Sequence, residues 1–191
     1  PRVIKLLGKP PGDGFPETHL YQQAIDISNR LNPAFVVITG DLVQDPLNLD
    51  QYQEFTRISE TLNEEIPMYL LPGNCDVGEQ PTHNLIGLYR DRFGADNYSF
   101  DHQGVHFLGL NSATIFDPLL VPNEWENQKK FMRSCIIHCL EVVQMKRIVI
   151  SYCLVSVDCF YSNNLKNIQL IQFFQDTGIV ITRPLMEDYK L

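Results

Sequence analysis

Short apolar runs alternate with amphipathic stretches along the first part of the chain. Three of the runs have the length and composition of buried strands: 2–7, 35–39 and 66–71. Between them, two stretches repeat apolar residues every three or four positions, which predicts amphipathic helices: 17–31 and 50–62. Two successive helix–strand units predict a sheet of parallel strands joined by crossover helices.

The first predicted helix places its apolar residues at Leu20, Ala24, Ile27 and Leu31 and ends at Asn32-Pro33, because the residue before a proline disfavours helix. Later in the chain the pattern predicts three more helices, at 85–93, 123–143 and 165–174. It also predicts a hairpin at 97–110, a strand at 147–157 and a short last strand at 179–182.

Polar residues follow two of the predicted strands directly. Gly40-Asp41 comes after the second strand, and Gly73-Asn74-Cys75-Asp76 comes after the third. In an open α/β sheet ligands bind outside the carboxyl ends of the strands, so we expect Asp41, Asn74 and Asp76 to line one cleft. The alternative is that Asp41 and Asn74 only cap the turns that end their strands.

Length and charge narrow the classes of protein. A chain of 191 residues predicts one domain, 1–191. The formal net charge of −8 argues against nucleic acid and anionic membranes as partners, because both require clustered Lys and Arg. No apolar run approaches the length of about 20 residues that spans a bilayer, and the five cysteines are scattered and odd in number. A cytoplasmic location with reduced thiols is the expectation.

Gly40-Asp41 and Gly73-Asn74-Cys75-Asp76 resemble two signature blocks of the calcineurin-like metallophosphoesterases, G-D and G-N-H-[DE]. The run from Tyr98 to Ser112 is also similar to that family, and the nearest branch is that of the small cytosolic serine/threonine phosphatases. The resemblance implies a layered α/β/β/α sandwich. Because the family's last block, G-H-x-H, would lie at or beyond Arg183-Pro184, it also implies a C-terminally truncated sandwich.

The same resemblance implies metal-dependent hydrolysis of a phosphoester, with a phosphorylated protein or a small phosphoester as substrate. Divalent iron, manganese or zinc would be the cofactor. Asp41 would bridge two metals, Asn74 would bind the second metal, and Asp76 would orient residue 75. In the family a histidine at that place donates a proton to the leaving group, and here the residue is Cys75.

Other family positions differ. Ile4 and Leu6 stand where the first block, D-x-H, has its ligands, and no histidine follows His138. Tyr152 or Cys153 falls at the position of a further histidine ligand. These differences support an alternative function, a degenerate phosphatase that is catalytically impaired and acts as a binding or regulatory module.

The remaining candidates for metal binding are weaker. Cys135, His138 and Cys139 would lie on one side of a helix, but a zinc site needs a fourth ligand, so buried cysteines are the better interpretation. Four more polar residues lie near the predicted cleft or in its strands and are interpreted as surface or core residues: Asp13, His19, His83 and His106.

Overall fold

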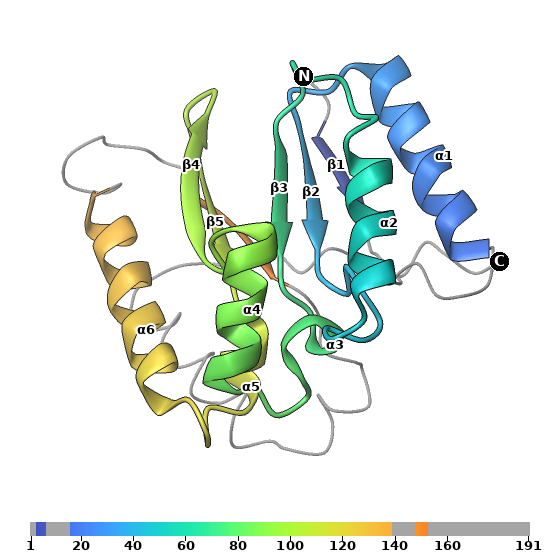
Figure 1. Ribbon diagram of the computed structural model, residues 1–191. Coiled ribbons are helices and arrows are strands. Elements are labelled where there is room, and N and C mark those ends of the chain that lie inside the picture. Colours follow the sequence, from blue (N-terminus) through green and yellow to red (C-terminus); the bar gives the residue numbers. More distant parts are fainter. Residues whose placement is uncertain (1–2, 7–15, 139–147, 153–191) are drawn as a thin grey trace, which may run out of the picture. The chain divides into compact units, whose positions relative to one another are not determined.

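Two three-stranded sheets form the centre of the fold in the computed structural model, which describes residues 3–6, 16–138 and 148–152 (Figure 1). The strands are β1 (Val3–Leu6), β2 (Phe35–Thr39), β3 (Met68–Leu71), β4 (Tyr98–His102), β5 (Val105–Leu110) and β6 (Ile148–Tyr152). The helices are α1 (Pro16–Leu31), α2 (Leu49–Ser59), α3 (Asn74–Val77), α4 (His83–Phe93), α5 (Ser112–Phe116) and α6 (Pro122–Ile137). The chain divides into two units, Pro1–Val155 and Ser156–Leu191, and all described residues lie in the first.

The first sheet has the order β1-β2-β3, and both of its pairs are parallel. β2 is buried along its whole length, as its β-branched and aromatic residues predict. The parallel strands that the helix–strand units predicted are confirmed. Their carboxyl ends therefore lie at one edge of this sheet.

The second sheet has the order β4-β5-β6, with β4 and β5 antiparallel and β5 and β6 parallel. Gln103 and Gly104 connect β4 to β5, and both have positive φ, 49° and 76°. A two-residue connection with two positive φ values is typical of the type I′ turns that match the twist of a hairpin. The predicted hairpin is confirmed, and the predicted strand at 147–157 is described over β6.

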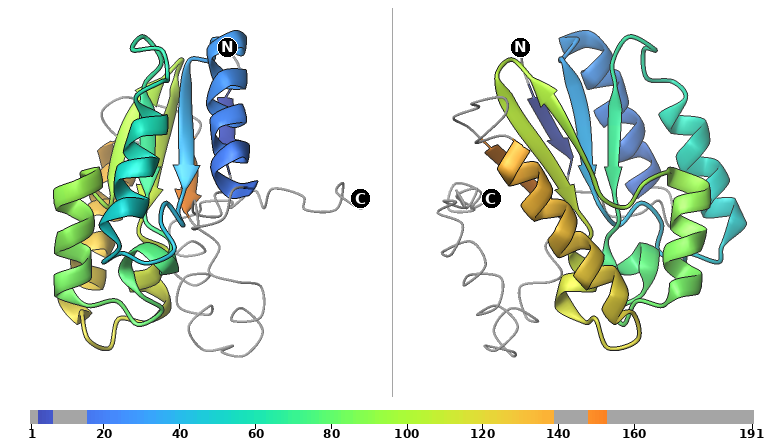
Figure 2. Two further views of the ribbon diagram at one scale, coloured as in Figure 1. Left: turned by 45° about the vertical axis from the view of Figure 1, so that its right-hand side comes forward. Right: turned by 90° about the vertical axis from the view of Figure 1, so that its left-hand side faces the viewer.

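Aromatic rings join the two sheets face to face. Phe35 of β2 contacts the rings of Phe100 and Phe107 at centroid distances of 5.0 and 5.2 Å, and Tyr69 of β3 stacks on Phe100 at 3.9 Å. On the outer face of the second sheet, Sγ of Cys135 in α6 lies 3.6 Å from Oγ of Ser99. Helices α1 and α2 cover the outer face of the first sheet (Figures 1 and 2). The layered α/β/β/α arrangement is thereby confirmed.

The buried face of α1 differs from the prediction. Leu20, Ile27 and Leu31 are exposed, with Leu20 at 64%. Ile25 and Ser28 are buried instead, and Tyr21 stacks on Phe55 of α2. The helix ends as predicted, because Asn32 takes positive φ and its N–H donates to the carbonyl of Ser28.

Three further results concern the sequence predictions. The short helices α3 and α5 were not predicted. The helix and strand predicted at 165–174 and 179–182 lie outside the described residues. In the part of the chain that the structure describes, no helix is both long and apolar enough to cross a bilayer.

Candidate functional site

Two loops at the carboxyl ends of β2 and β3 meet to form the candidate site. Gly40-Asp41 follows β2, and Asp41 has a positive φ of 56°. Gly73 follows β3 and precedes α3, which begins at Asn74. The predicted convergence of Asp41, Asn74 and Asp76 at this edge of the sheet agrees with this placement.

Gly73 lies directly against Asp41. A Cβ atom on Gly73 would stand 2.3 Å from Oδ1 of Asp41 and 2.4 Å from its backbone nitrogen. No residue with a side chain fits at that separation. Glycine at position 73 is therefore what allows the two loops to touch, and Oδ1 of Asp41 accepts a hydrogen bond of 3.2 Å from the N–H of Cys75.

Asp76 connects the two loops. Its Oδ1 accepts hydrogen bonds from the backbone N–H groups of Leu42 (2.9 Å) and Val43 (3.0 Å), and its Oδ2 accepts one of 2.7 Å from Gly73. The side chain is buried. Burial raises the pKa of Asp76 to about 7, although the three N–H donors favour the charged form and act in the opposite direction.

Cys75 is partly exposed and lies close enough to Asp41 and Asp76 to feel the charge of both carboxylates. Burial and then the charge of Asp41 raise the pKa of its thiol to about 12. A thiol with that pKa is protonated at neutral pH, so it can donate a hydrogen bond but is a poor nucleophile and a weak acid. Its Sγ lies 3.8 Å from Nε2 of Gln44.

Gln44 and the backbone donors of Leu42 and Val43 were not predicted from the sequence. Gln44 lies three residues after Asp41 on the same loop, which is the signal that could have indicated it. Backbone N–H groups occur in almost every residue and carry no signal in a sequence. Asn74, by contrast, was predicted and is the partly buried first residue of α3.

The other candidates are spread over the fold. His19 is exposed on α1, and His83 begins α4 and lies 3.7 Å from Glu124. His106 is buried in β5, where its Nδ1 lies 2.5 Å from Oδ1 of Asp101. Cys135 is buried, as the interpretation of that segment predicted. Asp13, Cys139 and Cys153 lie outside the described residues, and Tyr152 is described only as the last residue of β6.

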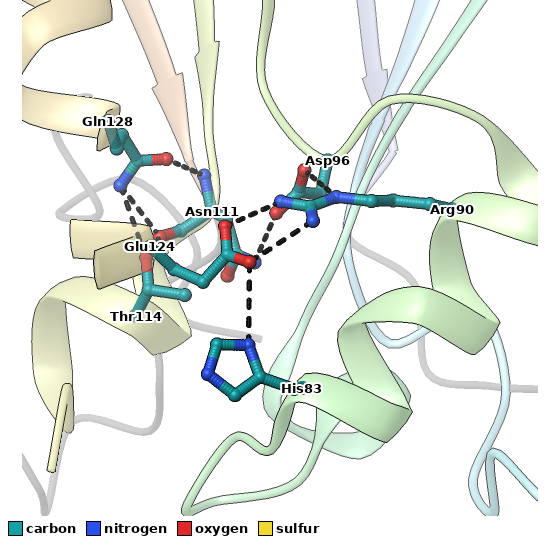
Figure 3. Close-up of polar contacts among 7 residues, drawn as sticks. All are labelled: His83, Arg90, Asp96, Asn111, Thr114, Glu124 and Gln128. Carbon is teal, nitrogen blue, oxygen red and sulfur yellow. Dashed lines mark hydrogen bonds and ion pairs between the residues drawn. The ribbon is translucent and has the colours of Figure 1, made fainter. Parts of the chain in front are cut away.

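Asn111, which follows β5 at the same edge, belongs to a buried polar network (Figure 3). Its Nδ2 donates to Oδ2 of Asp96 at 2.9 Å, and its backbone N–H donates to Oε1 of Gln128. Arg90 donates to Asp96 and, through its two terminal nitrogens, to Glu124. The side-chain amide of Asn111 thus bonds Asp96, which Arg90 of α4 also contacts, and its backbone N–H bonds Gln128 of α6.

The described residues do not fit a catalytic metal centre. Among them, no three His, Cys, Asp or Glu side chains lie close enough together to hold a metal ion. Asp76 is buried and both of its oxygens accept hydrogen bonds from backbone groups, so among the described residues the carboxylate of Asp41 and the amide of Asn74 are the oxygen ligands that the cleft offers. Catalytic metal sites commonly have three protein ligands.

Comparison with known proteins identifies the class. The profile of the calcineurin-like phosphoesterases matches residues 14–173, well over half of the chain. The chain therefore belongs to the calcineurin-like phosphoesterase family.

Similar proteins within that family are serine/threonine-protein phosphatases named CPPED1. The Bos taurus protein is 38% identical over 112 residues, which cover 56% of this chain and 36% of that protein. The Homo sapiens protein is 32% identical over 122 residues, which cover 61% of this chain and 39% of that protein. The chain thus spans a little over a third of the length of the curated relatives it matches.

Among solved structures, the chain is similar to GAP50, the anchor in the inner membrane complex of Plasmodium. The TM-score is 0.56 at 12% identity, and the match covers 93% of this chain and 62% of that chain. At an identity this low, the similarity shows a shared fold and does not indicate a shared function.

Proposed function

We propose that this protein is a phosphoester hydrolase that acts on phosphorylated protein or on small phosphoesters. Family membership supports the reaction class, and the relatives named serine/threonine-protein phosphatase support the substrate class. The observation that carries the proposal is the meeting of the Asp41 loop and the Asn74-Cys75 loop at the carboxyl edge of the parallel sheet.

Three side chains would face the substrate. Asn74 can donate its amide N–H to a phosphoryl oxygen, and the protonated thiol of Cys75 can donate a second, weaker hydrogen bond. Asp41 can accept a hydrogen bond from a water molecule with the part of its carboxylate that Cys75 leaves unused. A carboxylate repels a phosphate dianion, so these residues orient the ester but do not neutralise its charge.

Phosphate release by the purified chain tests this function. We expect saturable hydrolysis of p-nitrophenyl phosphate and of a phosphoserine peptide, measured with manganese, iron or zinc added, since the family generally uses divalent metals. Asp41→Asn should lower kcat/KM at least about tenfold, which corresponds to about 1.4 kcal/mol of transition-state stabilisation.

Asp91→Asn is the matched control, because Asp91 is an exposed aspartate on α4 and its substitution should leave the rate unchanged. Equal rates for wild type and Asp41→Asn would show that the assigned cleft is not the site. No release above the buffer rate under any metal would contradict the hydrolase proposal.

A second candidate is a binding or regulatory module without hydrolysis. It is favoured by one observation, that the described residues of the cleft present two oxygen ligands, whereas a catalytic metal commonly has three protein ligands. Titration calorimetry with the phosphoserine peptide separates the two functions. Binding without phosphate release supports the module, and binding followed by release supports the hydrolase.

Three predictions about the setting of the protein accompany the proposal: a cytoplasmic location, no nucleic-acid partner and no membrane partner. They rest on the acidic net charge and on the scattered cysteines. Imaging of the tagged protein in cells checks the location.

A further inference from the structure

Hydrogen bonds from backbone N–H groups to carboxylates connect the two cleft loops. Three backbone N–H groups donate to a carboxylate across the loops, Leu42 and Val43 to Asp76 and Cys75 to Asp41, and a fourth, that of Gly73, donates to Asp76 within its own loop. The bonds from Leu42 and Val43 to Asp76 join positions 34 and 33 residues apart in sequence.

The shape of the loops adds to these bonds. Gly73 packs against Asp41 with no room for a side chain, and Asp76 is 2% exposed. Water therefore has little access to the bonds that Asp76 accepts, and an unpaired N–H group at this depth would be costly. The loops are held in contact by hydrogen bonding and by packing together.

A divalent ion that held the same loops would need more ligands than the described residues of the cleft supply. A metal would bind the carboxylates of the cleft, but both oxygens of the buried Asp76 accept hydrogen bonds from backbone groups. With Asp41 and Asn74 left, the described residues supply too few ligands for a stable divalent site.

We propose that the cleft of this protein is assembled without metal, and that Asp76 is the cross-link that holds its two loops together. The proposal goes beyond the proposed function, because it concerns how the cleft is held and not which reaction takes place there. It would stand whether or not the chain hydrolyses phosphoesters.

Hydrogen exchange measured by mass spectrometry tests the metal half of the proposal on the full, wild-type chain. Peptides that contain Leu42, Val43, Gly73 and Cys75 report on the four donors. We expect the same protection in EDTA as in excess manganese or zinc, and no metal retained after desalting by elemental mass spectrometry. Retained metal together with at least about tenfold slower exchange in these peptides would overturn the proposal.

Two variants test the cross-link itself. Asp76→Asn removes one carboxylate oxygen, and exchange at Leu42, Val43 or Gly73 should accelerate at least about tenfold, equivalent to about 1.4 kcal/mol of local opening. Asp41→Asn should accelerate exchange at Cys75 and spare the other three, and it keeps the test valid if Asp76→Asn does not fold. Asp91→Asn is the control and should change none of the four.

The distribution of faster exchange among the peptides shows whether Asp76 holds the two loops together or stabilises the whole fold. Acceleration confined to the two loops, with α4 and β2 still protected, supports the role of Asp76. Unchanged exchange at all three of its donors in a folded Asp76→Asn variant would overturn it. Failure of the phosphatase assay would leave these exchange results unaffected, so the two proposals can fail independently.

Discussion

Gly73 sets the closest approach between the two cleft loops, because the space that a side chain would fill is taken by the backbone and carboxylate of Asp41. We expect Gly73→Ala to lower the free energy of unfolding by about 1–3 kcal/mol, the usual cost of overpacking. Gly87→Ala is the control. A Cβ at Gly87 would have no atom within 4 Å, so alanine should stabilise α4 by about 0.5–1 kcal/mol. Urea denaturation of both variants measures the difference, and equal effects would contradict this account of Gly73.

The thiol of Cys75 should react slowly, and faster as pH rises. Its pKa is raised to about 12, so at pH 8 about one molecule in ten thousand carries the thiolate, the form that alkylating reagents attack. We expect alkylation by iodoacetamide to be on the order of a thousandfold slower than in the unfolded chain and to rise about tenfold per pH unit up to pH 11.

Peptide mass spectrometry resolves Cys75 from the other cysteines and gives the rate. Asp41→Asn should accelerate the reaction, because the charge of Asp41 contributes to the raised pKa. A rate that is high and flat between pH 7 and pH 9 would show that the thiol ionises easily and would contradict the assignment of Cys75 as a protonated group.

At the scale of helices and strands, Arg90 connects α4 with α6 and with the segment that precedes β4. Its side chain on α4 donates to Asp96, which is 5% exposed ahead of β4, and to Glu124 in α6. Removal of the arginine leaves a buried carboxylate with one fewer partner, so we expect Arg90→Ala to cost about 1–3 kcal/mol. Arg57→Ala is the matched control: the Arg57 side chain is 60% exposed and pairs with Glu54 in the same helix, and its loss should cost much less than the loss of Arg90.

Thermal denaturation of Arg90→Ala and Arg57→Ala measures the two losses of stability, and Arg90→Lys is a third variant for the same measurement. Lysine keeps the charge but cannot contact Asp96 and Glu124 together as the guanidinium does, so it should restore only part of the stability. Equal losses for Arg57→Ala and Arg90→Ala would indicate that the network contributes no more than an ordinary surface ion pair.

The elements themselves were largely predictable because their signals are local. Buried strands, the hairpin and the ends of the helices depend on residues that are neighbours in sequence. The buried face of α1 was not predictable in this way. That helix carries two apolar stripes with the same period, and packing of Tyr21 against Phe55 of α2 selects the stripe with Ile25 over the one with Leu20 and Ile27. Periodicity identifies a helix but does not choose between two such stripes.

In the candidate site, too, some features could be predicted from the sequence and others could not. The meeting of Asp41 with Asn74 and Asp76 could be predicted, because the carboxyl ends of parallel strands share one edge. The partners of Asp76 could not, since they are backbone N–H groups, which every residue except proline has. The structure shows that Asp76 accepts hydrogen bonds from three backbone groups. The role of Asp76 in orienting residue 75 stays a prediction.

At the scale of the whole described unit, the layer of aromatic rings between the two sheets holds the structure together. Phe35 is 2% exposed and contacts rings from β3, β4 and β5: Tyr69, Phe100, His102 and Phe107. Each edge-to-face pair adds about 0.5–1.5 kcal/mol to the burial of apolar area. The packing of the two sheets against each other depends on this layer.

Phe35→Ala should therefore lower the free energy of unfolding by about 3–5 kcal/mol, a large share of the 5–15 kcal/mol that a domain usually has. Phe35→Leu fills part of the space and should lose less, which keeps the measurement possible if the alanine variant does not fold. Leu119→Ala is the control, because Leu119 is 72% exposed and its truncation should change stability by no more than about 0.5 kcal/mol. Urea denaturation gives all three values. If Phe35→Leu and Leu119→Ala lost the same small amount, the sheets would be held by contacts elsewhere, and the aromatic layer would merely fill the space between them.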